Sequence, residues 1–102
     1  MVKHIVIWQQ DDRYTKEEKI SNGIKIKESL EALKDVIPGI ISIKVITNLL
    51  PSGSDSDDLV LESVFESEEA LNQYQNHPEH LKAASFVRSV VKNRKCVDYY
   101  EQ

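Results

Sequence analysis

Two of the three histidines in the chain lie in the short segment from Tyr74 to His80, on either side of a proline. Histidine has an ordinary pKa of about 6.5, so its ring can accept or release a proton near neutral pH. A tyrosine hydroxyl can donate a hydrogen bond to an oxygen that gains negative charge. These residue types make the segment the first candidate for proton transfer or for binding of a polar group.

Pro78 determines how this segment folds. Proline has no N–H to donate and disfavours helical backbone at the residue before it, so one helix should end near Asn76 and the next should begin at Pro78. We therefore interpret His77 and Pro78 as a structural kink, with His77 at the helix N-cap. His80 falls in the first turn of the new helix, where the positive end of the dipole disfavours imidazolium and leaves a ring that can accept a proton.

Other roles remain open for the same residues. Tyr74 ends an apolar helix face, where packing in the core with its hydroxyl at the rim is the usual arrangement. His77 and His80 are also possible metal ligands, but a stable site generally needs a third protein ligand, which His4 or Glu79 would have to supply. We expect no metal, and the three glycines form no phosphate-binding loop, so we expect no cofactor.

Composition limits the class of protein. The 102 residues, 40% hydrophobic and 29% charged, predict one domain over residues 1–102 with a small core. The net charge of −4 and pI near 5.3 argue against nucleic acid as a partner. The one basic cluster, from Arg88 to Lys95, is interpreted as a solvated helix end.

Cysteine usage and the N-terminal segment favour a cytoplasmic protein. Cys96 is the one cysteine, so it cannot form an internal disulfide, and we interpret it as a small buried hydrophobe. The sequence has no basic N-terminal segment followed by an apolar stretch of signal-peptide length. We expect a reducing cytoplasm and no membrane partner.

The first half of the chain predicts a strand and a long helix. Val2 to Trp8 is rich in β-branched residues, and both of its faces are largely apolar, as in a central strand. Thr15 to Glu18 forms a capping box that begins the helix, which stops at Pro38-Gly39. Its apolar residues recur at helical spacing: Ile20, Ile24, Ile26, Leu30, Leu33 and Ile37.

The second half predicts a hairpin, two helices and a last strand. The strands are Ile40 to Leu50 and Leu59 to Phe65, and the acidic loop between them lacks the glycine and glutamate of a calcium loop. Ser67 caps a short helix, a second helix runs from Pro78 to Val91, and Lys95 to Tyr100 forms the fourth strand. This order is that of an α+β, ferredoxin-like β-α-β-β-α-β fold with one antiparallel four-stranded sheet and both helical segments on one face.

Two further expectations follow from this fold. A small-molecule pocket should lie between the sheet and the helices, bordered by Tyr74 and His80 and lined by His4, Val6, Trp8, Ile24, Leu61 and Leu81. The opposite face of the sheet should also be apolar, through Ile5 and Ile7 and through Ile41, Ile43 and Val45. A second copy of the sheet would cover that face, so we expect a homodimer.

Several motifs, taken in order, resemble the stress-responsive A/B barrel (Dabb) family. They are the start Met1-Val2-Lys3-His4-Ile5-Val6, the turn Ile37-Pro38-Gly39-Ile40, the stretch from Phe65-Glu66-Ser67 to His77-Pro78-Glu79-His80, and the closing Asp98-Tyr99. The resemblance spans nearly the whole chain and implies a dimeric α+β barrel.

The resemblance also implies candidate activities. The family includes plant stress proteins, bacterial members of unknown function and the polyketide cyclase that makes olivetolic acid. In that cyclase a histidine matching His80 is the general base, and a tyrosine matching Tyr74 assists at the substrate. This chain departs from it in having Leu59 where the cyclase has a histidine on its third strand, and Ile24 where the cyclase has aromatic residues.

Three functions are consistent with the sequence. The first is a binding or stress-associated homodimer with a small apolar or carbonyl-rich ligand. The second is a cyclase-like or lyase-like enzyme in which His80 is the base and Tyr74 the oxyanion partner. The third is a structural dimer without a ligand, and a monooxygenase on the same fold is a further competitor by fold analogy.

Overall fold

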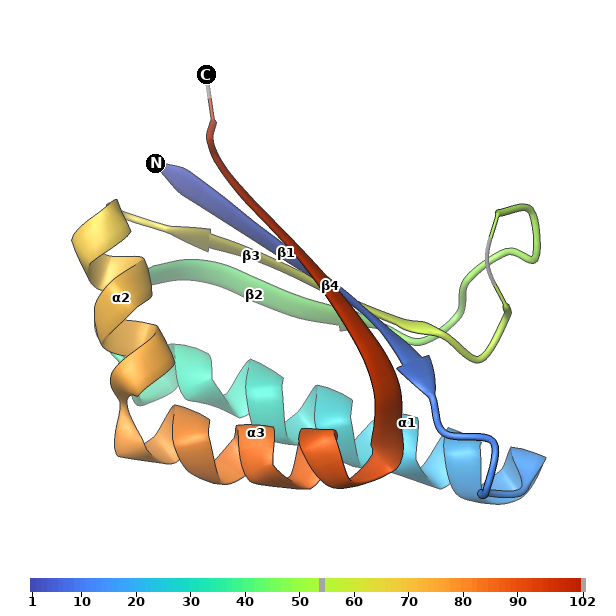
Figure 1. Ribbon diagram of the computed structural model, residues 1–102. Helices are drawn as coiled ribbons and strands as arrows, with labels where there is room; N and C mark the ends of the chain where they lie inside the picture. Colours follow the sequence, from blue (N-terminus) through green and yellow to red (C-terminus); the bar gives the residue numbers. More distant parts are fainter. Residues whose placement is uncertain (54, 102) are drawn as a thin grey trace.

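The computed structural model has one antiparallel sheet with its helices packed on one face, and it describes residues 1–53 and 55–101 (Figure 1). The strand order is β2-β3-β1-β4. This arrangement confirms the predicted ferredoxin-like fold class. The elements are β1 (Val2–Gln10), α1 (Lys16–Glu31), a 3₁₀ helix η1 (Ala32–Asp35), β2 (Ile40–Ile46), β3 (Leu59–Phe65), α2 (Glu68–Asn76), α3 (Pro78–Val90) and β4 (Val91–Tyr100).

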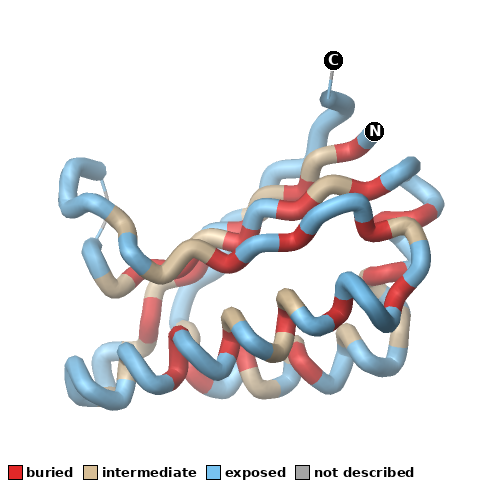
Figure 2. Tube along the Cα trace, turned by 180° about the vertical axis from the view of Figure 1, so that it is seen from behind, coloured by how far each residue is buried: buried red, intermediate tan, exposed pale blue. Residues whose placement is uncertain are grey.

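The central position of β1 explains why both of its faces are apolar. It pairs with β3 on one side and with β4 on the other. His4, Val6 and Trp8 are buried on the inner face, toward the helices, whereas Ile7 on the outer face is 41% exposed. Figure 2 shows the buried residues concentrated where the sheet and the helices face each other.

Helix α1 begins as the sequence predicts, and four of the six residues predicted for the apolar stripe are buried, namely Ile26, Leu30, Leu33 and Ile37. Both hydrogen bonds of the capping box between Thr15 and Glu18 are present, at 3.1 and 2.8 Å. Ile20 and Ile24, expected in the apolar stripe, are 58% and 49% exposed. The buried stripe passes through Ile26 instead, and a residue two positions away lies about 200° around the helix, so Ile24 faces solvent.

Strand β2 is shorter than predicted and carries an irregularity at its start. The pairing with β3 shifts register between Ile40 and Ser42, as in a β-bulge. After this shift Ile43 and Val45 are buried, whereas Ile41 is 40% exposed. The prediction that all three lie on the outer face was therefore wrong, because an extra residue in one strand reverses the alternation.

The turn before β2 places this strand against α2. Gly39 has φ +88, and a Cβ at this position would lie 2.7 Å from the Cβ of Ala70. Glycine is the residue that allows both the left-handed backbone and this close approach. The carbonyl oxygen of Gly39 also accepts a hydrogen bond from the backbone N–H of Glu66, at 3.0 Å.

The last helix and strand follow one another directly. α3 ends at Val90, and β4 begins at Val91, four residues before the predicted start at Lys95. The helix predicted to reach Val91 ends one residue earlier, and the strand predicted to begin at Lys95 is longer than expected at its start. Because no loop intervenes, β4 begins beside the C-terminal end of α3. It then runs antiparallel to β1 along the whole length of that strand (Figure 1).

The outer face of the sheet has an apolar centre. Ile5 pairs with Val97, and Ile7 pairs with Val60. Ile7 and Val97 are 41% and 49% exposed, and Tyr99 is 46% exposed. No helix in residues 1–53 and 55–101 is long and apolar enough to cross a membrane.

Candidate functional site

A cavity of about 200 Å³ lies between the inner face of the sheet and the helices. Strands, helices and both halves of the chain contribute to its walls. The lining residues are His4, Val6, Trp8, Leu30, Leu61, Tyr74, His80, Ala84, Val87, Arg88 and Arg94. Most of this lining is aliphatic or aromatic, with polar groups from His4, Tyr74, His80 and the two arginines.

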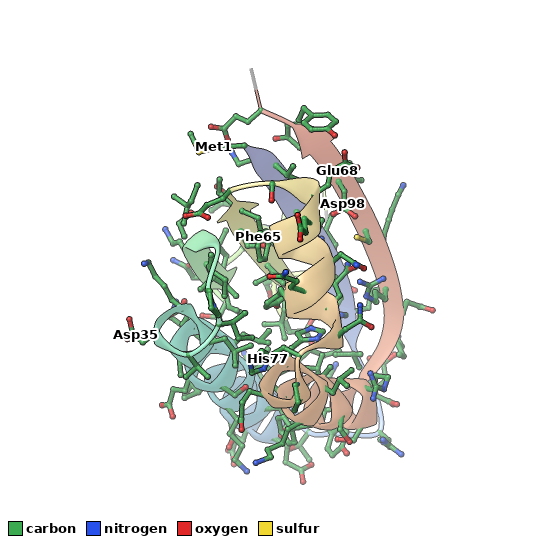
Figure 3. The ribbon with its side chains drawn as sticks, turned by 90° about the vertical axis from the view of Figure 1, so that its left-hand side faces the viewer. Met1, Asp35, Phe65, Glu68, His77 and Asp98 are labelled. Carbon is green, nitrogen blue, oxygen red and sulfur yellow. The ribbon has the colours of Figure 1, made fainter. Side chains whose placement is uncertain are left out.

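The junction between α2 and α3 brings Tyr74 and His80 together. His77 is the N-cap of α3, and its Nδ1 accepts a hydrogen bond from the Glu79 backbone N–H at 3.1 Å. Figure 3 shows His77 at the point where the two helices meet. With the chain turned here, the ring centroids of Tyr74 and His80 are 4.3 Å apart, at an interplanar angle of 44°.

The His80 ring has the protonation state of a base. Its Nδ1 lies 3.2 Å from the carbonyl oxygen of Gln75. A carbonyl oxygen can only accept, so Nδ1 carries the proton of the neutral ring and Nε2 keeps a free lone pair. Burial lowers the pKa of His80, and the charges of His4, Arg88 and Arg94 lower it further, so the neutral ring predominates at neutral pH.

The Tyr74 hydroxyl stays protonated and can donate a hydrogen bond. The residue is fully buried, and its hydroxyl has no partner among the described residues. Burial raises the pKa of the phenol, which keeps the hydroxyl protonated. A buried hydroxyl without a partner lowers the stability of the fold.

His4 on β1 is hydrogen-bonded to an aspartate on β4. It lies directly opposite Asp98 in the pairing of β1 with β4, and its Nδ1 donates a hydrogen bond to Asp98 Oδ1. His4 is 2% exposed, and its ring centroid is 6.3 Å from that of Tyr74. The carboxylate accepts the hydrogen bond from Nδ1 and so fixes the orientation of the ring. No spacing in the sequence indicates this pair, because 94 positions separate its members.

One cluster on the inner face has donor atoms suitable for a metal ion. The Sγ atom of Cys96 lies 3.6 Å from His4 Nδ1 and 3.6 Å from Asp98 Oδ1. Nitrogen, sulfur and oxygen donors of this kind suit zinc and related divalent ions. Burial and the charge of Asp98 raise the pKa of the Cys96 thiol. His4 and Asp98 already satisfy one another through their hydrogen bond, so the cluster has no unmet need for an ion.

The cavity contains four of the six predicted lining residues, namely His4, Val6, Trp8 and Leu61. Ile24 and Leu81, 49% and 48% exposed, lie outside it. On α3 the residues that line the cavity are 80, 84, 87 and 88, and position 81 is about 100° around the helix from position 80. Arg88 and Arg94, interpreted from sequence as part of a solvated helix end, are exposed to solvent and also line the cavity.

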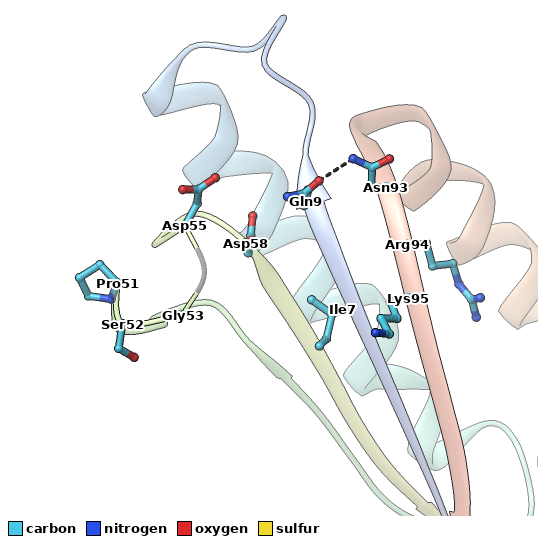
Figure 4. A pocket seen from close by; sticks show the side chains of 10 residues that line it. All are labelled: Ile7, Gln9, Pro51, Ser52, Gly53, Asp55, Asp58, Asn93, Arg94 and Lys95. Carbon is cyan, nitrogen blue, oxygen red and sulfur yellow. Dashed lines mark hydrogen bonds between the residues drawn. The ribbon is translucent and has the colours of Figure 1, made fainter.

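A larger open cleft, of about 760 Å³, lies elsewhere (Figure 4). It is formed by the loop between β2 and β3 and by outer-face residues such as Ile7 and Lys95. Gln9 and Asn93 are hydrogen-bonded across it. Neither Tyr74 nor His80 contributes to this cleft, so it belongs to the outer surface of the sheet and not to the histidine site.

The sheet order, the helices on one face and the cavity between the two layers define a ferredoxin-like α+β protein. The chain matches the stress responsive A/B barrel domain over residues 2–101 and belongs to that family. This confirms the family resemblance seen in the sequence.

Solved structures support the same assignment. A dimeric protein of unknown function and ferredoxin-like fold from Bacteroides fragilis is 35% identical, with a TM-score of 0.86; the match covers 96% of this chain and 93% of that one. Hydroxynitrile lyase from Passiflora edulis has the same fold at 21% identity and a TM-score of 0.73, covering 96% and 90% of the two chains. No protein of curated function matches the chain in sequence.

The lowered pKa of His80 should make stability depend on pH. Between that pKa and the ordinary value of about 6.5 the unfolded chain binds more protons, so the folded state loses stability as the pH falls through this window. His80→Gln removes this contribution. Urea unfolding at about pH 8 and about pH 5 should show a larger loss for the parent than for the variant. Identical losses would contradict the prediction.

Proposed function

We propose that this protein is a homodimeric stress-responsive A/B barrel domain, formed by residues 1–102, that binds a small apolar or carbonyl-containing ligand between the sheet and α2–α3. One observation carries the proposal: the Tyr74 hydroxyl, which has no partner among the described residues, lines a single, mainly apolar cavity together with His4 and the neutral ring of His80. Pockets for small molecules typically combine an apolar wall with a few polar groups that orient the ligand.

The outer face of the sheet supports the homodimer. Ile7 on β1 and Val97 and Tyr99 on β4 are exposed on this face, where Val97 lies opposite Ile5. Surfaces of this kind mark interaction sites, and a second copy of the same sheet is the simplest complementary partner. Structures of the same fold from Bacteroides fragilis and Thermobifida fusca are described as dimeric.

Sedimentation tests the homodimer. The parent should sediment as a dimer at micromolar concentration, and Val97→Lys should shift it toward monomer because a lysine charge would be buried in the interface. Ile20→Lys places the same charge on an exposed position of α1 and should leave the dimer intact. A parent protein that remains monomeric would refute this part of the proposal.

The size of the cavity limits the ligand. At about 200 Å³ it is smaller than the roughly 300–1,000 Å³ typical of sites for drug-sized molecules. Trp8, Val6 and Leu61 supply a flat apolar wall from the sheet, and Ala84 and Val87 face it from α3. A body about the size of one aromatic ring fits this arrangement.

Filling the cavity tests ligand binding. Trp8 is the one tryptophan and lines the cavity, so its fluorescence should report binding of a small aryl ketone such as acetophenone. Ala84→Phe should weaken this response by about tenfold or more because its ring occupies the ligand volume. Ser85→Phe adds the same ring at an exposed neighbouring position and should bind like the parent. Equal responses from both variants would exclude this cavity as the site.

A proton-transfer enzyme is the second candidate. It is favoured by a neutral His80 ring beside a protonated Tyr74 hydroxyl. The free Nε2 of His80 can accept a proton from the carbon beside a carbonyl, and the protonated Tyr74 hydroxyl can donate to the enolate oxygen that forms. This division of roles fits the cyclase-like or lyase-like chemistry implied by the family resemblance.

Hydrogen exchange tests this second candidate. In D₂O the parent should exchange the methyl protons of acetophenone faster than buffer, as followed by NMR. His80→Gln should reduce this catalysed exchange by about a hundredfold, because it removes the base. Tyr74→Phe should reduce the catalysed rate through loss of the oxyanion donor. Exchange that is the same in the parent and in His80→Gln would exclude His80 as the base.

A further inference from the structure

We infer that the cavity selects ligands that carry one anionic group, such as a carboxylate, on a small apolar body. This inference rests on the proposed ligand-binding function and specifies the chemical class of the ligand. It depends on Arg88 and Arg94, whose positions at the cavity the sequence did not reveal.

The two arginines reach the cavity from different elements. Arg88 lies eight positions after His80 on α3, about 80° around the helix from it, and Arg94 lies opposite Trp8 in the pairing of β4 with β1. Figure 4 shows Arg94 leaving β4 on the side away from Ile7 and Lys95. Arg88 from the helix and Arg94 from the strand therefore line the same cavity, and Arg94 also lines the outer cleft.

No carboxylate in the described part of the chain neutralises these arginines. The ion pairs found there involve other cations, namely Lys3, His4, Arg13, Lys19, Lys27, Lys82 and Lys92. No aspartate or glutamate lines the cavity, although the chain as a whole has a net charge of −4. Asp98 is the acid beside His4, and it is engaged in their hydrogen bond. The cavity is thus a local positive site on an acidic protein.

The chemistry of these groups favours a carboxylate. Arginine presents several N–H donors in a plane and binds carboxylates through paired, charge-assisted hydrogen bonds. Tyr74 offers a further donor, and the positive charge of Arg94 acts on its hydroxyl by partly offsetting the rise in its pKa. The remaining lining, including Trp8, Leu61 and Val87, suits the apolar body of the ligand.

A matched pair of probes tests this inference. Benzoate and benzamide have nearly the same shape and differ in charge, and both can be titrated against Trp8 fluorescence at low ionic strength. The parent should bind benzoate about tenfold or more tightly than benzamide. Arg94→Gln and Arg88→Gln should each weaken benzoate binding several-fold and leave benzamide binding unchanged. Added salt should weaken benzoate binding, because both guanidinium groups are partly exposed.

Arg13→Gln is the control for net charge, because Arg13 is an exposed arginine that pairs with Asp11 outside the cavity. This variant should bind both probes like the parent. Equal affinity of the parent for benzoate and benzamide would overturn the inference and leave the ligand-binding proposal standing. If the parent binds neither probe nor acetophenone, both proposals fail. If Arg13→Gln weakens benzoate binding as much as Arg94→Gln does, selection by the cavity arginines is refuted.

Discussion

The antiparallel pairing of β1 with β4 is the interaction on which the geometry of the site depends. It brings residues 91–100 against residues 2–10, and in this register Asp98 lies opposite His4 and Arg94 opposite Trp8. A shift of one residue would turn these side chains to the other face of the sheet. The orientation of the His4 ring and the position of one of the two cavity arginines both follow from this one ladder.

The break at Pro78 supplies the other half of the site. An uninterrupted helix from Glu68 to Val90 would extend about 35 Å and would carry its later residues away from the sheet. Ending α2 at Asn76 lets α3 pack along the sheet with His80, Ala84 and Val87 facing it. The cost of the break is small, because His77 caps the new helix and proline at its first position has no N–H that needs a partner.

The cavity combines features that oppose one another energetically. It places the Tyr74 hydroxyl, which is buried without a partner among the described residues, beside apolar walls, whereas Arg88 and Arg94 are exposed to solvent. A buried polar group left without a partner destabilises a fold, so the Tyr74 hydroxyl lowers the stability of this protein. The sheet is apolar on both faces, with one face occupied by this site and the other available for a second copy of the chain.

The sequence predicted what depends on local rules. The capping box at Thr15, the break at Pro78, the order of the elements and the inward face of β1 all follow from backbone chemistry and from the two-residue period of a strand. It failed for Ile24, Leu81 and Ile43, because the face that a helix turns inward and the alternation after a bulge are settled by packing and pairing with distant segments. The sequence by itself thus determined the fold class and identified Tyr74 and His80. Only the tertiary structure joined His4 to Asp98 and brought Arg88 and Arg94 to the cavity, because strand register and helix rotation join residues that no sequence spacing relates.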